Sequence, residues 1–257
     1  FIAIESKSFF KDVCERFVKN KRAMIALVIF LIIALMAIFG PMISPYSYDG
    51  MDTAIMNQRP STAHWFGTDR FGRDLFTRVL YGARISLMVG IVTAVINTII
   101  GVIYGGIAGY VGGRVDMWMM RLTDILYSIP DLLYIILIML IFGSNVRSII
   151  IGVCVAGWIS MARMVRSQII TLKEQEFALA AFVLGANSRR ILFKHLIVNS
   201  LGTIIVTVTL MIPQAIFMEA FLSFVGVGIS APMAEQKVGK RSAIDTWLSI
   251  GAGWFLM

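Results

Sequence analysis

The sequence contains 257 residues, of which 58% are hydrophobic and only 15% are charged. Soluble domains are about 45–50% apolar, so the excess excludes an ordinary soluble protein and makes a lipid bilayer the natural solvent. The net charge of +8 does not indicate nucleic-acid binding, because the basic residues lie beside apolar runs and no groove-reading motif occurs. The two cysteines, Cys14 and Cys154, do not predict a disulfide framework.

The first part of the chain combines a basic segment with an uncharged apolar run. Residues 1–22 hold six Lys or Arg side chains among apolar residues at helical spacing, which predicts an amphipathic segment on the cytoplasmic membrane surface. Residues 23–43 are predicted to be a retained transmembrane helix, since about 20 apolar residues cross the hydrocarbon layer. Pro41 and Pro45 are expected to end this helix, and residues 44–83 to form an extracytoplasmic loop.

The remaining residues, 84–257, are predicted to form a helical membrane core. Gly101, Gly105 and Gly109 make two overlapping GxxxG motifs, a spacing that lets two helices approach closely in lipid. The sequence therefore predicts an all-α, polytopic membrane protein with about six transmembrane helices, the last one truncated or divergent. The apolar runs after the first are residues 84–109, 117–142 (broken by Pro130), 147–170, 198–227 (containing Pro213) and 244–257.

Lysine and arginine residues predict the orientation of these helices. The N-terminal flank, the connection that contains Arg114 and residues 171–195 are basic, and all three lie on the cytoplasmic face if the N-terminus is inside. The loop 44–83 also carries four arginines, which conflicts with an external location. The stronger basic clusters and the first helix are expected to decide the topology.

Residues 174–196, EQEFALAAFVLGANSRRILFKHL, connect the fourth and fifth runs and are unusually polar for this chain. We expect a helix from Glu176 to Leu184, a left-handed Gly185 that ends it, and a second helix capped by Ser188. The result is a short, rigid elbow with an apolar ridge and basic edges. Its apolar ridge fits either a groove on a soluble partner or the lipid surface, and the residues alone leave both open.

The elbow resembles the coupling segment of ABC importer permeases, in which an acid, two alanines, three further residues and a glycine follow one another. Here Ala180, Ala181 and Gly185 match, whereas Leu179 replaces the acid and Val198 replaces a later proline. Residues 64–90 resemble the loop before the second span in the C-type permeases of dipeptide and oligopeptide importers, and residues 219–232 resemble the end of their fifth span. After residue 232 the likeness ends.

This resemblance implies a type I permease fold with its core at residues 84–257 and a coupling helix at 174–196. It also implies a second, B-type permease, two ATP-binding subunits that carry ATP and Mg²⁺, an extracytoplasmic peptide-binding protein, and a bacterial or archaeal cell (inner) membrane. No cofactor is expected in this chain, and nucleic acid is not an expected partner. The residues expected to couple to the ATPases are Glu176, Ala180, Ala181, Gly185, Arg189 and Arg190.

The sequence predicts no catalytic or metal site. It contains no phosphate-binding G-x-x-x-x-G-K-[ST] motif, and the predicted topology places His64 and His195 on opposite sides of the membrane. The chain is therefore expected to be a permease subunit and not an enzyme.

Charged residues within the spans are candidates for the translocation path, because a buried carboxylate must face the protein interior or water. Asp131, Glu219 and Ser223 are the candidate path-lining residues. A hydrogen bond of Glu219 to a neighbouring helix or to Ser223 is the competing interpretation. Arg121 and Asp124, three residues apart, are expected to pair with each other.

Two other functions are alternatives to a peptide importer. An importer of the same family for nickel or another small solute is compatible with every motif, because the choice of cargo depends largely on the binding protein. An ion-driven secondary transporter is disfavoured, because such proteins usually show inverted repeats and intramembrane acid or histidine relays.

Overall fold

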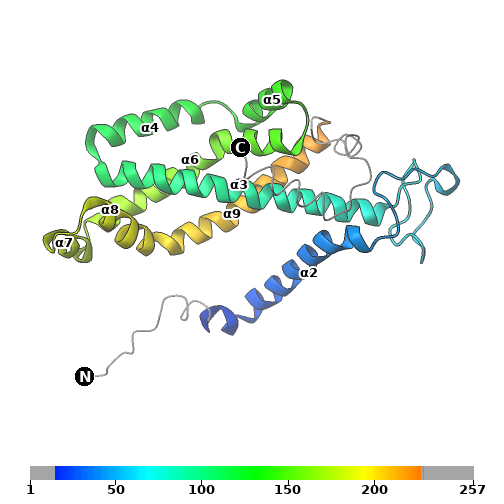
Figure 1. Cartoon of the computed structure of the whole chain (residues 1–257), viewed down its shortest axis with the longest axis horizontal. Helices are drawn as coiled ribbons and strands as arrows, with labels where there is room; N and C mark the ends of the chain where they lie inside the picture. Colours follow the sequence, from blue (N-terminus) through cyan, green and yellow to red (C-terminus); the bar gives the residue numbers. More distant parts are fainter. Residues whose placement is uncertain (1–14, 227, 229–257) are drawn as a thin grey trace. The chain divides into compact units, whose positions relative to one another are not determined.

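Helices make up almost all regular structure in the computed structural model, which describes residues 15–226 and 228 (Figure 1). These residues contain no β-strand. The chain divides into two compact units, residues 1–84 with 242–257 and residues 85–241. The elements are α2 (Lys21–Ile43), η1 (Thr53–Ile55), α3 (Leu75–Val111), α4 (Gly113–Tyr127), α5 (Asp131–Phe142), α6 (Val146–Lys173), α7 (Glu176–Val183), α8 (Ser188–Arg190), η2 (Ile191–Leu196) and α9 (Ile197–Phe224).

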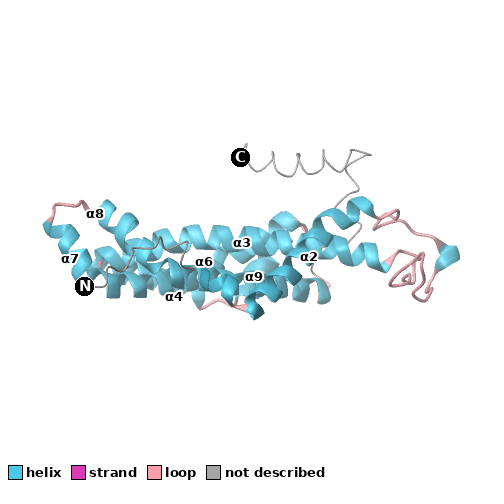
Figure 2. Ribbon diagram, turned by 90° about the horizontal axis from the view of Figure 1, so that it is seen from below, coloured by secondary structure: helices cyan, strands magenta, loops and turns pink. Residues whose placement is uncertain are grey.

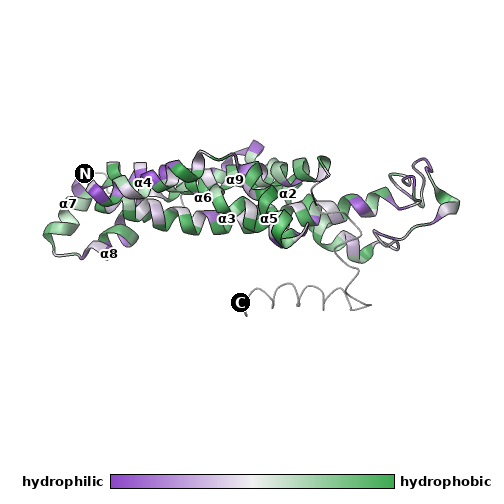
Figure 3. Ribbon diagram, turned by 90° about the horizontal axis from the view of Figure 1, so that it is seen from above, coloured by the Kyte–Doolittle hydropathy of each residue, from purple (hydrophilic) through white to green (hydrophobic). Residues whose placement is uncertain are grey.

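Length and composition confirm an all-α protein with several membrane-spanning helices. Four segments are long and apolar enough to cross a bilayer, namely α2, α3, α6 and the continuous run α8–η2–α9, and the bent pair α4 and α5 raises the number to five. Hydrophobic residues dominate these helices, as Figure 3 shows. The expected sixth helix at 244–257 and most of the basic segment 1–22 lie outside the described residues.

Helix α3 begins earlier than the sequence suggests, and α2 ends later than its first proline. The Asp74 carboxylate accepts a hydrogen bond of 2.8 Å from the backbone N–H of Thr77, so it caps α3, and residues 75–83 of the expected loop are helical. Pro41 lies inside α2, which continues to Ile43. A proline in the last turn removes one hydrogen bond without stopping the helix, since Ser44 N–H still bonds to the Gly40 carbonyl.

Proline and glycine residues set the path of the chain through α4 and α5. Gly112 and Gly113 have positive φ angles of 68° and 57° and reverse the chain between α3 and α4. Pro130 separates α4 from α5, and the two helices are bent by 73°, which confirms the expected break. Pro213, in contrast, lies inside a continuous α9.

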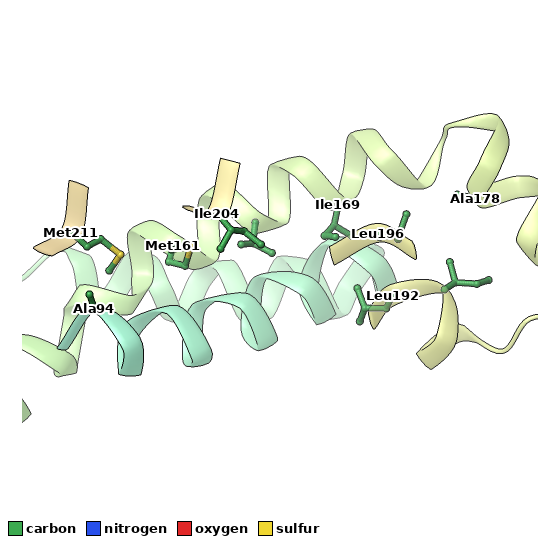
Figure 4. Packing of buried hydrophobic residues seen from close by; sticks show 10 residues of the cluster. Ala94, Met161, Ile169, Ala178, Leu192, Leu196, Ile204 and Met211 are labelled. Atoms are coloured by element: carbon green, nitrogen blue, oxygen red, sulfur yellow. The ribbon is translucent and has the colours of Figure 1, made fainter. Parts of the chain in front are cut away.

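The second unit packs α3, α6 and α9 around a long apolar core. Helices α6 and α9 lie side by side, as Figures 1 and 2 show. The core cluster extends from Ala94 of α3 to Ala178 of α7, and Figure 4 shows Ile169 of α6 beside Leu196 of η2. The core of the spans is therefore continuous with the base of the elbow.

The GxxxG glycines of α3 lie against α6, which confirms the predicted close approach. A Cβ atom at Gly105 would lie 2.1 Å from the carbonyl oxygen of Ala162, and one at Gly109 would lie 2.7 Å from that of Arg166. A Cβ at Gly101 would lie 2.6 Å from the Met161 side chain. These contacts leave no space for a side chain, so glycine allows the two backbones to pack directly.

Candidate functional site

The first half of the elbow is a two-turn helix with a well-defined end. Helix α7 runs from Glu176 to Val183, and Gly185 follows with a φ of +81°. The N–H of Ala186 bonds to the carbonyl of Ala181, and the N–H of Gly185 bonds to that of Phe182, both at 3.0 Å. This pair of bonds is a Schellman motif, which satisfies the last carbonyls of the helix. The predicted helix and its left-handed glycine are confirmed.

The second half of the elbow begins one residue earlier than predicted. The cap is Asn187 and not Ser188, because the Asn187 side chain accepts a 2.8 Å hydrogen bond from the N–H of Arg190. Asparagine is as good a cap as serine, so the residue types alone did not decide between adjacent positions. The six residues of η2 are π-helical and continue directly into α9. Such wide turns are rare and occur frequently at functional sites.

One face of the elbow is buried and the other is strongly apolar yet exposed. Ala178 of α7 and Ile191, Leu192 and Leu196 of η2 are buried in the main core. The exposed ridge consists of four side chains with increasing exposure, namely Leu179 (55%), Phe182 (70%), Val183 (82%) and Leu184 (86%). We call these four residues the elbow ridge.

The predicted coupling residues surround this ridge but differ in their exposure. Glu176, Ala180, Arg189 and Arg190 are exposed, whereas Ala181 is partly buried against the core. A side chain at Gly185 would have open space around it, so glycine is favoured there only because of its positive φ angle. The predicted coupling residues thus place one acidic and two basic side chains beside the apolar ridge.

The end of α6, from which the elbow continues, is held to α3 and α4 by contacts that the sequence did not predict. The Lys173 ammonium, at the last residue of α6, donates to the carbonyl of Gly109 in α3 at 3.1 Å. The Arg166 guanidinium forms a bidentate ion pair with Asp116 of α4: Nε donates to Oδ1, and Nη2 donates to Oδ2 at 2.5 Å. An open cavity of about 490 Å³ lies between α3, α6 and the elbow, and its lining consists of Tyr110, Lys173, Glu174, Ala178, Leu179, Phe182 and Ile191.

The predicted pairing of Arg121 with Asp124 is wrong. Asp124 accepts a 2.8 Å hydrogen bond from Arg163 of α6. Spacing along one helix made Arg121 the expected partner, but the packing of α4 against α6 brings a residue 39 positions away into contact.

Glu219 is buried, and its carboxylate accepts hydrogen bonds from two hydroxyl groups. Ser86 of α3 donates to one oxygen at 2.6 Å, and Ser223, one turn along α9, donates to the other at 3.1 Å. This geometry favours the interpretation of Glu219 as a link between helices. Asp131 is exposed at the first residue of α5, where the positive end of the helix dipole stabilises its charge. A role for Asp131, Glu219 or Ser223 in the path remains a prediction.

The loop before α3 is held together by the motif that resembles peptide permeases. The Asp69 carboxylate accepts hydrogen bonds from the N–H groups of Phe71 and Arg73, at 2.8 and 3.0 Å. It also accepts from the guanidinium groups of Arg73 (2.8 Å) and Arg78 (2.5 Å). Burial raises the pKa of Asp69, but the hydrogen bonds from Arg73 and Phe71 and the Arg73 charge outweigh it and lower the pKa to about 2.

A second carboxylate ties this loop to α3. His64 Nδ1 lies 2.9 Å from Asp74 Oδ1, and both side chains are buried. Burial raises the pKa of Asp74, but hydrogen bonds from Thr77 and His64 lower it overall. Within the described residues no group of three or more His, Cys, Asp or Glu side chains is placed to bind a metal ion.

Comparisons with known proteins identify the family of the chain. The family described as "Binding-protein-dependent transport system inner membrane component" matches residues 101–257, more than half of the sequence. The chain belongs to this family. The N-terminal TM domain of oligopeptide transport permease C matches residues 8–60 of the permease.

Several named relatives align with most of the permease. The oligopeptide transport system permease protein OppC of Bacillus subtilis is 49% identical over 91% of this chain and 76% of its own length. The dipeptide transport system permease protein DppC of the same organism is 48% identical over 98% of this chain and 78% of its own. OppC of Escherichia coli K12 is 42% identical over 100% of this chain and 87% of its own length.

These matches confirm a multi-pass, inner-membrane permease subunit of an ABC transporter. The relatives are permease proteins of transport systems, so the chain is a subunit and not itself an ATPase. The resemblance of the loop and elbow motifs to peptide-importer permeases is thereby confirmed at the level of the family. The expectation that the likeness ends after residue 232 is wrong, because the family match continues to residue 257.

Proposed function

We propose that this permease forms part of an ATP-driven importer of dipeptides or oligopeptides. The names of the relatives, which include both oligopeptide and dipeptide permeases at 48–49% identity, support a peptide cargo. The match of residues 8–60 to the N-terminal domain of oligopeptide permease C supports the same cargo from a separate part of the chain.

The elbow couples this permease to the ATPase subunits. The observation that carries this step is the elbow ridge, whose four apolar side chains are 55–86% exposed on a helix with a fully satisfied end. An exposed apolar ridge on a short rigid helix fits a hydrophobic groove on a partner protein. The ridge belongs to α7, which a turn at residues 184–187 separates from α8 but which packs against η2. Because η2 continues into α9 without a loop, this packing passes a displacement of the ridge to a transmembrane helix.

The complete importer requires further subunits. Two ATP-binding subunits hold ATP and Mg²⁺ against the elbows, a second, B-type permease completes the path, and an extracytoplasmic binding protein delivers the peptide. The N-terminus and the elbow lie on the cytoplasmic side, where both basic segments belong. Closure of the ATPases then switches the path from one side of the membrane to the other.

Reconstitution of the complete importer in proteoliposomes tests this function. With internal ATP, the complex is expected to take up labelled dipeptides or oligopeptides in the presence of the binding protein, and to take up no Ni²⁺. Uptake of Ni²⁺ instead of peptide would assign another cargo within the family. Uptake by this chain alone, driven by an ion gradient without ATPase subunits, would overturn the ATP-driven mechanism.

A further inference from the structure

Helix α9 carries a line of uncharged polar side chains along one side of a transmembrane span. Asn199, Thr203, Thr207 and Gln214 are spaced by four, four and seven residues, which places them within about one quadrant of the helix. Asn199, Thr203 and Gln214 are exposed, and Thr207 is partly exposed. We call these four residues the polar stripe.

The polar stripe borders the packing face of α9 and does not belong to it. The buried side of the helix includes Ile204 and Met211, which Figure 4 shows among the core residues against α3 and α6. Exposed apolar side chains lie beside the stripe, at Val206 and Phe224, and also within its quadrant, at Leu210 (62% exposed) and Phe217 (72% exposed). The polar stripe thus shares the exposed face of α9 with apolar side chains, next to the packed face of the helix.

Gln214 is the member of the stripe that lipid would tolerate least. The hydroxyl of Thr207 donates to the carbonyl of Thr203 at 2.9 Å, and the amide of Asn199 donates to that of His195 at 2.6 Å. No such bond joins the Gln214 carboxamide to another part of the chain that the structure describes. The neighbouring Pro213 also lacks an N–H, so the helix leaves the carbonyl of Thr209 without its usual partner.

We propose that the polar stripe lines the translocation path and that Gln214 contacts the cargo. This inference rests on the proposed function, because it needs a peptide as the transported solute. Polar side chains within a span that face away from the core require water or a polar partner. A carboxamide both donates and accepts hydrogen bonds, so Gln214 can pair with the N–H and C=O groups that every peptide carries. Recognition of this kind is independent of the peptide sequence.

The stripe also explains how the elbow acts on the path. Asn199, the first residue of the stripe, lies three positions after the last residue of η2. The second half of the elbow, α8 and η2, therefore forms one continuous helical segment with the stripe, and α7 packs against it. A tilt of this segment reorients the stripe relative to the second permease.

Cysteine accessibility in the assembled importer tests this proposal. In a cysteine-free background, which in this chain needs Cys14→Ser and Cys154→Ala, the variants Gln214→Cys and Thr203→Cys are treated with a charged methanethiosulfonate reagent. Ile205→Cys is the matched control, since Ile205 is 51% exposed but lies 200° around the helix from Thr203. We expect both stripe positions to react at least about tenfold faster than the control, because the reactive thiolate forms only in water.

A transported peptide is further expected to slow the modification of Gln214→Cys. Gln214→Leu should reduce peptide uptake about fivefold, as expected for one net hydrogen bond, and Gln214→Asn should restore part of the uptake. Slow reaction of both stripe cysteines, at the rate of the control, would overturn the proposal in favour of lipid contact. Disulfide formation between position 214 and the second permease, without reaction with the reagent, would overturn it in favour of a subunit interface.

The two proposals fail in different ways. A wild-type complex that takes up another solute and no peptide would defeat the proposed function, and the accessibility of the stripe would still report a path. A complex that transports peptide while position 214 stays inaccessible would defeat only the assignment of Gln214.

Discussion

Replacement of Gly105 by alanine tests how closely α3 and α6 pack. The added Cβ atom would lie 2.1 Å from the carbonyl oxygen of Ala162, which is 1.3 Å short of the 3.4 Å at which ordinary van der Waals contact begins. The Cβ is fixed to the backbone of α3 and the oxygen belongs to the backbone of α6, so neither can rotate away and the helices must separate. Overpacking of this kind costs about 1–3 kcal/mol.

Gly106→Ala is the matched control for this experiment. It adds the same methyl group to the same helix, but the nearest atom there is 3.6 Å away, at Leu192. The intrinsic helix preference of alanine over glycine, up to about 1 kcal/mol, applies to both variants and cancels in the comparison. We expect the purified Gly105→Ala protein to unfold at a clearly lower temperature in detergent than Gly106→Ala. Equal unfolding temperatures would refute the close backbone contact.

Three further predictions concern the elbow, the loop and the α4–α6 contact. Gly185→Ala places a Cβ at a φ of +81° and should destabilise the end of α7 by about 1 kcal/mol, seen as faster amide exchange of the elbow. Because the folded-state pKa of Asp69 is lowered to about 2 from 3.8, its carboxylate stabilises the loop above pH 4, and this stabilisation is lost as the pH falls through 2. After allowance for solvent screening it amounts to about 1–2 kcal/mol, and amide protection of the loop should fall further over this pH range in the wild type than in Asp69→Asn, in which Asp74 still titrates. Asp116→Asn should lower stability by about 1–2 kcal/mol, because the Arg166 side chain loses a charged partner.

Each of these three predictions has a result that contradicts it. Unchanged exchange in Gly185→Ala would show that α7 does not depend on its left-handed end. A loop whose protection is the same at pH 2 and pH 5 would rule out the stabilising role of Asp69. Asp124→Asn is the control for Asp116→Asn, since the Asp124 side chain is 59% exposed and its pair with Arg163 should contribute less than about 1 kcal/mol. Equal losses in the two variants would refute the distinction.

Features governed by neighbours in the sequence were predictable. The apolar runs predicted the transmembrane helices, and Pro130 and Gly185 predicted where α4 and α7 end. The GxxxG spacing predicted a close helix contact, although not that its partner is α6. In each case a local rule of helix formation acts on residues within one or two turns.

Features governed by distant partners were not predictable. Asp124 was expected to bond to the nearby Arg121, but its partner is Arg163 of another helix. The ion pair of Asp116 with Arg166 joins residues 50 positions apart, and no spacing along the chain indicates it. The early start of α3 depends on Asp74, which the sequence presents as one of several acids in a polar loop.

Photo-crosslinking from the elbow ridge in the assembled importer tests most directly whether the elbow contacts the ATPase. A photoreactive phenylalanine analogue replaces Phe182, which is 70% exposed, and in a second protein it replaces Trp118 of α4, which is equally exposed at 70%. We expect a crosslink from position 182 to an ATP-binding subunit and none from position 118. Crosslinks from position 182 to lipid alone, or to a protein on the outer side of the membrane, would contradict this expectation.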